Sequence, residues 1–351
     1  MNTALRIVTA GLGFGASVHV RGFLTLPNID VIAIAGKSEA NAKRIADSIG
    51  VANGVQGYEN LLEFCPDVVS IALPPKENAA AAEFFLKRGI PVLCEKPIAG
   101  DLLSARRLVE LSRQITHAVD FQFAELPVFS TAKTAIASGR IGRIRHIQIT
   151  WLVESFANLH KVKTWKRSTE GAGGVLSLFA SHVFYLLGWL ESPISEISCR
   201  LSSGGEVWQH QNNISPDTFQ CWAQLKSGAT ASMIISNASP GMHIHRWEMI
   251  GDQGSIVLEN RSSDYMANFS MTTLDREGQS RLEVEVKSDS EDGRIAAFAS
   301  LASRFVASVK AKVLTYPSFS DGLRVQLEID AAIKSNETRE IVSLSSMPIR
   351  V

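Results

Sequence analysis

Short apolar runs alternate with helical patterns over the first third of the chain. The apolar runs predict strands at Leu5–Ala10, Val31–Ala35, Val68–Leu73, Val92–Cys94 and Ala118–Phe121. Between them, the spacing of apolar residues predicts helices at Ser17–Leu26, Ala40–Ile49, Glu77–Arg88 and Leu102–Arg113. Strands that alternate with helices of about a dozen residues are typical of a doubly wound parallel sheet. We therefore expect residues 1–122 to form a Rossmann-type domain.

The pattern changes after residue 122, where longer strands with alternating polar and apolar positions follow one another. These strands are predicted at Ile144–Val153, Ile194–Leu201, Thr218–Leu225, Ala229–Ser236, His245–Ile250, Ser255–Glu259 and Leu282–Val286. Helices are predicted at Val128–Ala137, Val175–Leu190 and, near the end of the chain, Phe319–Ser335. Alternation of this kind indicates an antiparallel sheet with one covered face. The fold class is α/β, with residues 123–351 forming an α+β domain around a mostly antiparallel open sheet.

The balance of charges argues against two classes of partner, nucleic acid and membranes. The 351 residues contain 35 Lys and Arg and 35 Asp and Glu, so the formal net charge is zero. Nothing in this balance favours binding to nucleic acid, and it gives no electrostatic reason to bind an anionic membrane. The apolar stretch Val175–Leu190 is interrupted by serines and a histidine, which argues against a membrane span.

The cysteines and the amino terminus indicate the compartment. Four cysteines at positions 65, 94, 199 and 221 share no CxxC spacing, so we expect neither structural zinc nor any other metal. Reduced, buried thiols and the lack of a secretory pattern at the amino terminus predict a cytoplasmic protein.

A glycine-rich turn joins the first predicted strand to the first predicted helix. It contains Gly11, Gly13, Phe14 and Gly15, followed by the small Ala16. Gly11 permits the tight turn, and Gly13 lets the backbone approach a pyrophosphate that rests on free amides at the start of the helix. Glycine-rich turns also occur without ligands, but this one lies between a strand and a helix, which favours dinucleotide binding.

The end of the second strand bears on the choice of dinucleotide. NAD enzymes usually place an acidic residue there to bind the ribose 2′-hydroxyl. Here the strand ends in Ala35-Gly36-Lys37-Ser38, and no acid occurs before Glu39. A cation and a hydroxyl suit a 2′-phosphate, so NADP(H) is favoured and NAD(H) remains possible. The alternative is that Lys37 is a solvated charge on a turn.

The segment Glu95-Lys96-Pro97 resembles the signature of one enzyme family, the glucose–fructose oxidoreductase / inositol dehydrogenase / rhizopine catabolism (Gfo/Idh/MocA) family. Other segments match the same family in order along the chain. They are Ile71–Pro75, Ala137–Ile144, Trp165-Lys166 followed by Gly171–Leu176 and His182, and Phe319–Ile333. The resemblance extends from about residue 5 to about residue 340.

This resemblance implies roles for individual residues. Lys96 would lie between the nicotinamide and the substrate hydroxyl, where an ammonium stabilises developing alkoxide charge. Glu95 would bond the nicotinamide ribose, and His182 would act as the general acid or base. Pro97 would follow a cis peptide bond. The remaining implied positions beside the cofactor are Leu73, Pro74, Asn78 and Gln122, and those beside the substrate are Trp165 and Lys166.

The sequence departs from the family at the helix that carries His182. The family pattern Asp-x-Gly-x-His-x-x-Asp aligns with Leu178, Ala180, His182 and Tyr185, so the first acid is missing. An acid at position 178 would stand beside His182 on one helix face. His182 could also be a core residue, and Tyr185 either a proton donor or a packing residue. Candidates for the missing polar contact are Glu154, Asn158, His160 and Lys163, of which His160 is a second candidate for acid or base work.

Three functions are compatible with these residues. The first is an oxidoreductase that moves a hydride between nicotinamide C4 and a hydroxyl or carbonyl carbon of a small sugar-like substrate, with Lys96 and His182 assisting proton transfer. The second is a non-catalytic NAD(P)-binding regulator on the same fold, and the third is an imine or enone reductase. We also expect a homodimer or homotetramer formed through the carboxyl-terminal sheet, because a large apolar sheet face is rarely left in water.

Overall fold

The computed structural model describes residues 4–160, 162, 164–203, 213–285 and 292–347. Contacts between residues divide the chain into two compact units. The first unit contains Met1–Gln122 and Arg294–Gln326, and the second contains Phe123–Gly293 and Leu327–Val351. Of the helices in the described part of the chain, none combines the length and apolar character needed to cross a lipid bilayer.

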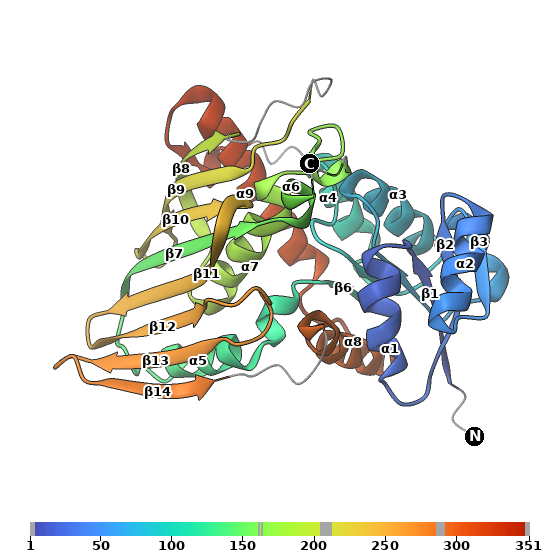
Figure 1. The fold of residues 1–351 in the computed structure, drawn as a ribbon, viewed down its shortest axis with the longest axis horizontal. Helices are drawn as coiled ribbons and strands as arrows, with labels where there is room; N and C mark the ends of the chain where they lie inside the picture. Colours follow the sequence, from blue (N-terminus) through green and yellow to red (C-terminus); the bar gives the residue numbers. More distant parts are fainter. Residues whose placement is uncertain (1–3, 161, 163, 204–212, 286–291, 348–351) are drawn as a thin grey trace. The chain divides into compact units, whose positions relative to one another are not determined.

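The first unit is built on a parallel sheet whose six described strands follow the order β3-β2-β1-β4-β5-β6 (Figure 1). This is the strand order of a Rossmann fold, with its switch point between β1 and β4. The strands are β1 (Leu5–Ala10), β2 (Ile29–Gly36), β3 (Asn53–Gln56), β4 (Val68–Ile71), β5 (Val92–Cys94) and β6 (His117–Val119). The parallel doubly wound sheet predicted for residues 1–122 is confirmed, and β3 is an additional strand that the pattern did not predict.

Four helices connect these strands. They are α1 (Arg21–Leu24), which continues a π-helical turn at Gly15–Val20, α2 (Glu39–Ile49), α3 (Pro75–Leu86) and α4 (Leu102–Leu111). Local residues explain where they begin: Ser38 and Asp101 accept bonds from free amides at the starts of α2 and α4, and α3 begins at Pro75. The helices begin and end within a few residues of their predicted limits.

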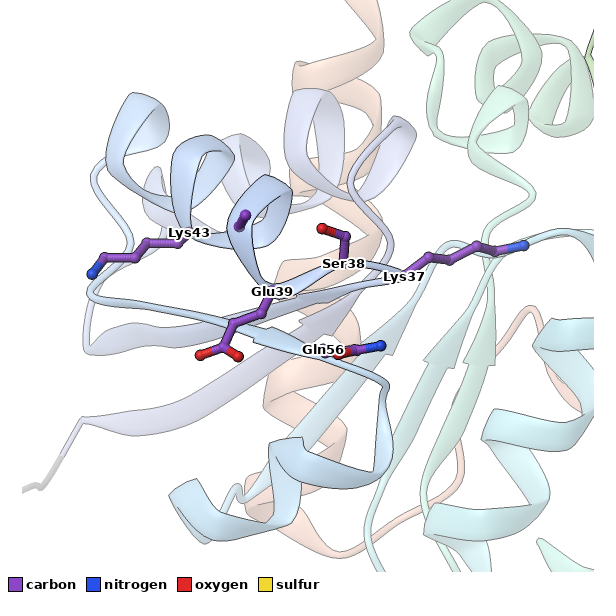
Figure 2. A pocket seen from close by; sticks show the side chains of 6 residues that line it. Lys37, Ser38, Glu39, Lys43 and Gln56 are labelled. Carbon is purple, nitrogen blue, oxygen red and sulfur yellow. The ribbon is translucent and has the colours of Figure 1, made fainter.

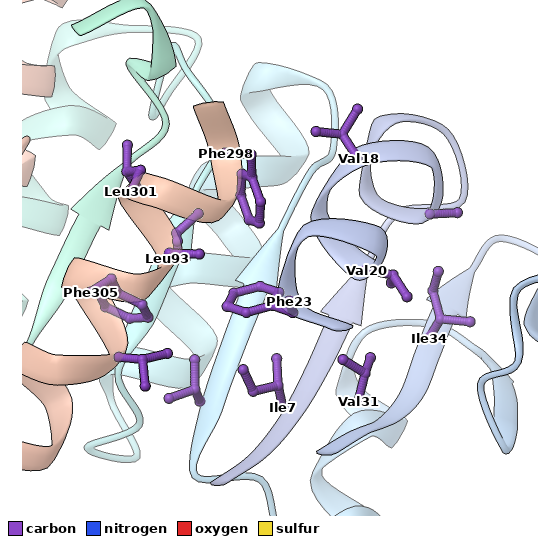
Figure 3. Packing of buried hydrophobic residues seen from close by; sticks show 14 of the residues in the cluster. Ile7, Val18, Val20, Phe23, Val31, Ile34, Leu93, Phe298, Leu301 and Phe305 are labelled. Carbon is purple, nitrogen blue, oxygen red and sulfur yellow. The ribbon is translucent and has the colours of Figure 1, made fainter. Parts of the chain in front are cut away.

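A further helix, α8 (Gly293–Ala311), belongs to the first unit although it lies far along the sequence. Phe298, Leu301 and Phe305 of α8 are buried in the core, and Figure 3 shows them facing Phe23 and the sheet residue Leu93. The rings of Phe298 and Phe23 meet edge to face with centroids 5.2 Å apart. The prediction of one continuous second domain over residues 123–351 is therefore wrong, because this apolar face covers the Rossmann sheet.

The second unit contains a larger sheet with the strand order β14-β13-β12-β11-β7-β10-β9-β8-β15 in its described residues. All neighbouring pairs are antiparallel except β7 with β10. The strands are β7 (Ile144–Glu154), β8 (Ile194–Ser202), β9 (Thr218–Leu225), β10 (Thr230–Ser236), β11 (Ala238–Gly251), β12 (Gly254–Asn260), β13 (Ser270–Asp275), β14 (Ser280–Glu285) and β15 (Val342–Ser343). The predicted mostly antiparallel sheet is confirmed. Residue 286 of the predicted last strand lies outside the described residues.

Helices cover one face of this sheet. Figure 1 shows α5 (Pro127–Ala137), α7 (Ser181–Leu190) and α9 (Phe319–Thr338) on one side of the strands, and α6 (Phe156–Leu159) is a single turn after β7. Alternate strand residues such as Ile147, Ile149 and Trp151 are buried on the covered side. On the other face Trp222 and Ile250 keep 37% and 42% of their surface exposed.

Candidate cofactor and active site

The glycine turn follows β1 at the carboxyl edge of the parallel sheet. Gly11 has φ +121°, and a Cβ atom there would overlap the carbonyl of Ala72, so the turn requires glycine. A Cβ on Gly13 would meet no heavy atom within 4 Å, which leaves open space beside its backbone. Phe14 precedes the π-helical turn, and Gly15 packs tightly against Thr9. The predicted sequence Gly11–Gly15 thus forms a close turn with an open approach at Gly13.

A buried amide ties two further predicted segments to this edge. Asn78, on α3, accepts a hydrogen bond from the Leu73 amide at 2.9 Å. Its Nδ2 donates to the carbonyl of Glu95 at 3.2 Å. Pro74 is the residue directly before α3. The side chain of Asn78 therefore fixes the segment after β4 against the segment after β5, which contains Glu95 and Lys96.

Glu95 and Lys96 directly follow β5. The Glu95 amide donates to the Ile71 carbonyl, which continues the parallel pairing past the end of the strand. The Lys96 amide donates to Glu95 Oε2 at 3.1 Å. The peptide bond between Lys96 and Pro97 is cis, as the family resemblance implied. Only 13% of the Glu95 side chain is exposed, so its other oxygen faces the interior.

A buried ionic cluster surrounds that inner oxygen. His19, from the π-helical turn after the glycines, has a fully buried side chain. Its Nε2 lies 3.4 Å from Glu95 Oε1 and 3.4 Å from Asp120 Oδ2, and its Nδ1 lies 2.7 Å from Ser70 Oγ. Burial would lower the pKa of His19, but its bonds to Asp120 and Glu95 outweigh that effect and raise it. Burial and the Glu95 charge raise the pKa of Asp120 to about 7.

Among the described residues, the side chains of this cluster also have the types and the spacing of metal ligands. His19, Glu95 and Asp120 each offer one ligand atom, and these atoms lie within 4.8 Å of one another. His19 Nε2 lies within hydrogen-bond distance of Glu95 Oε1 and pairs electrostatically with Asp120 Oδ2, whereas neither Asp120 oxygen has a hydrogen-bond partner among the described residues. Since the imidazole lies 3.4 Å from both carboxylates, we treat the cluster as an ion-pair network.

The end of β2 forms an open hollow lined by Lys37, Ser38, Glu39, Ala40, Lys43 and Gln56. Lys37 pairs with Glu77 at 2.8 Å, and its side chain is 83% exposed. Ser38 also caps α2 by accepting a bond from the Asn41 amide. Figure 2 shows Lys37 and Lys43 extending in opposite directions, with the Ser38 hydroxyl between them. Lys37 and Ser38 therefore place one cation and one hydroxyl at the end of β2.

Gln122 supplies an unpaired polar atom at this edge. It lies in a 3₁₀ turn after β6 and is 4% exposed. Within the described residues its Oε1 is buried without a hydrogen-bond partner. Buried polar atoms are rarely left unpaired, so this oxygen fits a ligand that donates a hydrogen bond. Together with the open space at Gly13, it makes the carboxyl edge of the first unit fit a dinucleotide.

His182 lies in the second unit, on α7, and is 5% exposed. Its ring meets Phe123 edge to face with centroids 4.8 Å apart, and Trp151 lies 6.5 Å away. Tyr185 is also buried, at 2% exposure. Leu178, which replaces the expected acid, is half-buried. The surroundings of His182 are thus mainly aromatic.

His245, on β11, belongs to the same aromatic cluster. Its ring stacks on Trp151 with centroids 3.9 Å apart and an interplanar angle of 5°. Trp247 Nε1 donates to His245 Nε2 at 2.9 Å. Burial lowers the pKa of His245 to about 3, so the imidazole is neutral at physiological pH. His245 is a neutral acceptor that orients Trp247.

The remaining predicted substrate residues lie in loops of the second unit. Trp165 and Lys166 form a 3₁₀ turn, and the Gly174 amide donates to the Lys166 carbonyl at 2.8 Å. A Cβ on Gly173 would overlap that turn, so the glycine run lets it pack close to the start of the helix carrying His182. His160 is exposed and packs on Phe156.

The residues proposed to replace the missing acid have different environments. Asn158 donates to the Asn237 carbonyl at 2.7 Å, so it supports the loop after β7. Glu154 is half-buried at the end of β7. Lys163 lies outside the described residues.

Sequence reasoning missed His19, Asp120 and His245. A polar residue inside an otherwise apolar run was the available signal in two cases. His19 stands between Val18 and Val20, and Asp120 between Val119 and Phe121. His245 lies between Ile244 and Arg246, and only the strand register shows that it points inward.

Two family models match this chain. The model described as the oxidoreductase family, NAD-binding Rossmann fold (GFO/IDH/MocA) matches residues 5–121. The model of the GFO/IDH/MocA carboxyl-terminal domain matches residues 129–257.

Individual relatives agree with these matches. An uncharacterized oxidoreductase of Synechocystis sp. (strain ATCC 27184 / PCC 6803 / Kazusa) is 28% identical over 361 residues, covering 98% of this chain and 97% of the relative. Levoglucosan dehydrogenase of Pseudarthrobacter phenanthrenivorans is 25% identical over 308 residues, covering 78% of each chain. A structure of levoglucosan dehydrogenase with NADH and levoglucosan has a TM-score of 0.86 at 20% identity, covering 97% of this chain and 100% of that one, which shows a shared fold.

Proposed function

Because this chain belongs to the GFO/IDH/MocA family of oxidoreductases, with an NAD-binding Rossmann fold, we propose that it is a dehydrogenase of sugar-like alcohols. It transfers a hydride between nicotinamide C4 and a hydroxyl or carbonyl carbon, with NADP(H) favoured over NAD(H). The relative that acts on levoglucosan supports a small polyhydroxylated substrate. Leu178, which stands where the family pattern has an acid, points to fewer hydroxyl contacts than that pattern provides.

One observation carries this proposal. The glycine turn, the Leu73–Asn78 segment, Glu95, Lys96 and Gln122 all lie after strands of the same parallel sheet. Ligands of open α/β sheets bind outside the carboxyl ends of the strands, beside the switch point. Residues separated by about 110 positions in sequence thus line one sheet edge.

The proposed site residues of the first unit, together with His182 of the second unit, have distinct tasks. The Gly13 backbone receives the pyrophosphate, and Glu95 accepts hydrogen bonds from the nicotinamide ribose. Lys96 holds a positive charge where alkoxide charge develops, and His182 gives or takes the hydroxyl proton. The bound nicotinamide supplies the hydride chemistry, and the protein supplies orientation and a proton path.

The preference for NADP(H) rests on Lys37 and Ser38. A 2′-phosphate carries charge that the exposed ammonium of Lys37 can neutralise while the Ser38 hydroxyl donates a hydrogen bond. The Lys37 ammonium already forms an ion pair with Glu77 at 2.8 Å, so a bound 2′-phosphate must displace this carboxylate. An exposed pair of this kind contributes only about 0–1 kcal/mol, which a phosphate can exceed.

A non-catalytic NAD(P)-binding regulator is the second candidate, favoured by the leucine at position 178. It predicts tight cofactor binding without turnover. An imine or enone reductase on the same scaffold is a third candidate, differing from the first in substrate. The aromatic surroundings of His182 are compatible with such a less hydroxylated substrate.

We also propose that the chain forms homodimers or homotetramers through the uncovered face of the second sheet. That face carries Trp222 and Ile250 together with polar residues such as Gln148 and Gln220. Mixed aromatic and polar surfaces of this kind are typical of protein interfaces.

Replacing Lys96 by methionine tests the proposed reaction, since it removes the charge and keeps most of the length. Turnover with NADP⁺ and a panel of sugars and polyols should fall by about 10²–10⁴-fold. The dissociation constant of NADPH, measured by fluorescence, should change little. Two results together would favour the non-catalytic regulator. The wild-type protein would bind NADPH without turning over any substrate, and the Lys96 variant would match the wild type in a biological assay.

A further inference from the structure

His19 joins the glycine turn to three other segments of the proposed cofactor edge. It lies in the turn Gly15–Val20, directly after Phe14 and the glycines. Its two ring nitrogens face Ser70 of β4, Glu95 after β5 and Asp120 after β6. The imidazole thus connects the loop for the pyrophosphate with the strand ends that carry Glu95 and Lys96.

The ring of His19 is held between two aromatic side chains. Phe298 of α8 stacks on it with centroids 4.2 Å apart and an interplanar angle of 16°. Phe14 approaches it edge to face at 5.5 Å. Since the ring is buried on both sides, it has little freedom to turn. Both nitrogens therefore keep their directions toward the polar groups.

Burial of three ionisable groups is costly, and a purely structural role would not require it. Two carboxylates and an imidazole in a protein interior lose solvation that an apolar core would not lose. Glu95 uses its second oxygen to accept the Lys96 amide at 3.1 Å. The contact of His19 with one Glu95 oxygen therefore fixes the orientation of the other.

We propose that His19 is a positioning residue of the cofactor site, which fixes the Glu95 carboxylate and, through it, the backbone of Lys96. This inference rests on the proposed function, because it assumes that Glu95 and Lys96 serve the nicotinamide half of the cofactor. His19 touches neither the cofactor nor the substrate in this role. It acts by holding the Glu95 side chain in one orientation.

Asp120 makes this link sensitive to pH. Its pKa of about 7 means that it is protonated in mild acid, where the His19 Nε2 proton is directed to Glu95 alone. Above pH 7 both carboxylates are charged and compete for that proton. The other charged or titratable groups near the cluster are Lys96, which lowers the pKa of Glu95, the buried thiol of Cys94, and Arg294, which lies over the Phe14 ring.

Paired substitutions of His19 test the proposal. In His19→Gln the amide nitrogen takes the place of Nε2 and can still donate to Glu95, whereas in His19→Asn it takes the place of Nδ1 and reaches only Ser70. We expect His19→Gln to bind NADPH within about threefold of wild type. His19→Asn should bind at least about tenfold more weakly, because the Glu95 carboxylate loses its buried donor.

Two further variants complete the experiment. His117, another buried histidine of the first unit, bonds the Ile115 carbonyl, and His117→Gln should leave NADPH binding unchanged. Asp120→Asn should remove the inflection near pH 7 from the pH dependence of the NADPH dissociation constant. Thermal unfolding of each variant identifies losses that come from misfolding.

Several results would overturn the inference. Equal NADPH affinity in His19→Gln, His19→Asn and wild type would leave His19 with a packing role. A stoichiometric divalent cation in the purified protein, whose removal by a chelator weakens NADPH binding, would make the cluster a metal site. A wild-type protein that binds neither NADPH nor NADH would instead contradict the proposed function.

Discussion

Lys37 is the residue on which the choice between the two cofactors depends. We expect Lys37→Asp to raise the dissociation constant of NADPH about tenfold or more above any effect on NADH, because a carboxylate repels the 2′-phosphate. Parallel fluorescence titrations with both cofactors measure this difference. Lys87→Asp is a control with the same charge change, since Lys87 follows the end of α3 and does not line this hollow. Equal effects of Lys37→Asp on NADPH and NADH would remove the assignment.

His245 makes the second unit sensitive to acid. Its folded-state pKa of about 3 lies below the ordinary value of about 6.5 for a solvated imidazole, so the unfolded chain binds this proton first as the pH falls. The contribution of the neutral imidazole to the free energy of unfolding is fully present above pH 6.5. It is lost between pH 6.5 and about 3, by about 1.4 kcal/mol per pH unit. His245→Gln keeps an acceptor for Trp247 and does not titrate. Its unfolding midpoint should depend less steeply on pH than that of wild type between pH 6.5 and 4, and equal slopes would contradict this account.

At the scale of elements, two glycines of the same turn have different roles: Gly11 is required for folding, and Gly13 is expected to be required for NADPH binding. Gly13→Ala should fold normally, because its Cβ meets nothing within 4 Å, and should weaken NADPH binding about tenfold by crowding the pyrophosphate. Gly11→Ala should destabilise the protein itself by about 1–3 kcal/mol, because a Cβ there overlaps Ala72.

Thermal unfolding and NADPH titration of the two glycine variants check this contrast. A Gly13→Ala variant with wild-type affinity for NADPH would show that the turn does not receive the cofactor. A Gly11→Ala variant as stable as wild type would show that the strained turn is not required.

Most elements could be predicted from sequence because their residues follow one pattern. The strands β1, β4 and β5 are continuous apolar runs, as expected for a buried parallel sheet. By contrast, β3 contains one large apolar residue, Val55, and gives no periodic signal. The helix α8 was missed because alanine and serine dominate it, although Phe298, Leu301 and Phe305 recur at helical spacing.

The candidate site was predictable to the extent that it follows local motifs. The glycine turn and the Glu95-Lys96 segment are contiguous in sequence, so their residues could be named. The cluster of His19, Glu95 and Asp120 draws on segments separated by up to 101 positions. Only the strand order brings these residues together, and no single motif contains the information.

At the scale of the whole molecule, the uncovered sheet face predicts association between copies of the chain. Light scattering should give a mass of two or four times 38.2 kDa for the wild-type protein. Trp222→Glu should reduce the mass toward that of one chain, because it places a charge in the centre of the face. Leu103→Glu is a control in the first unit, where Leu103 is 77% exposed on α4. A wild-type protein that is monomeric at micromolar concentration would contradict this proposal.

The central claim is that the carboxyl edge of the parallel sheet binds a pyridine dinucleotide beside Lys96. A crystal structure of the chain with NADPH tests it most directly. We predict the pyrophosphate at the Gly13 amide and the Lys96 ammonium within about 4–5 Å of nicotinamide C4, close to van der Waals contact. A cofactor bound elsewhere, or a lysine directed away from the nicotinamide ring, would contradict the account.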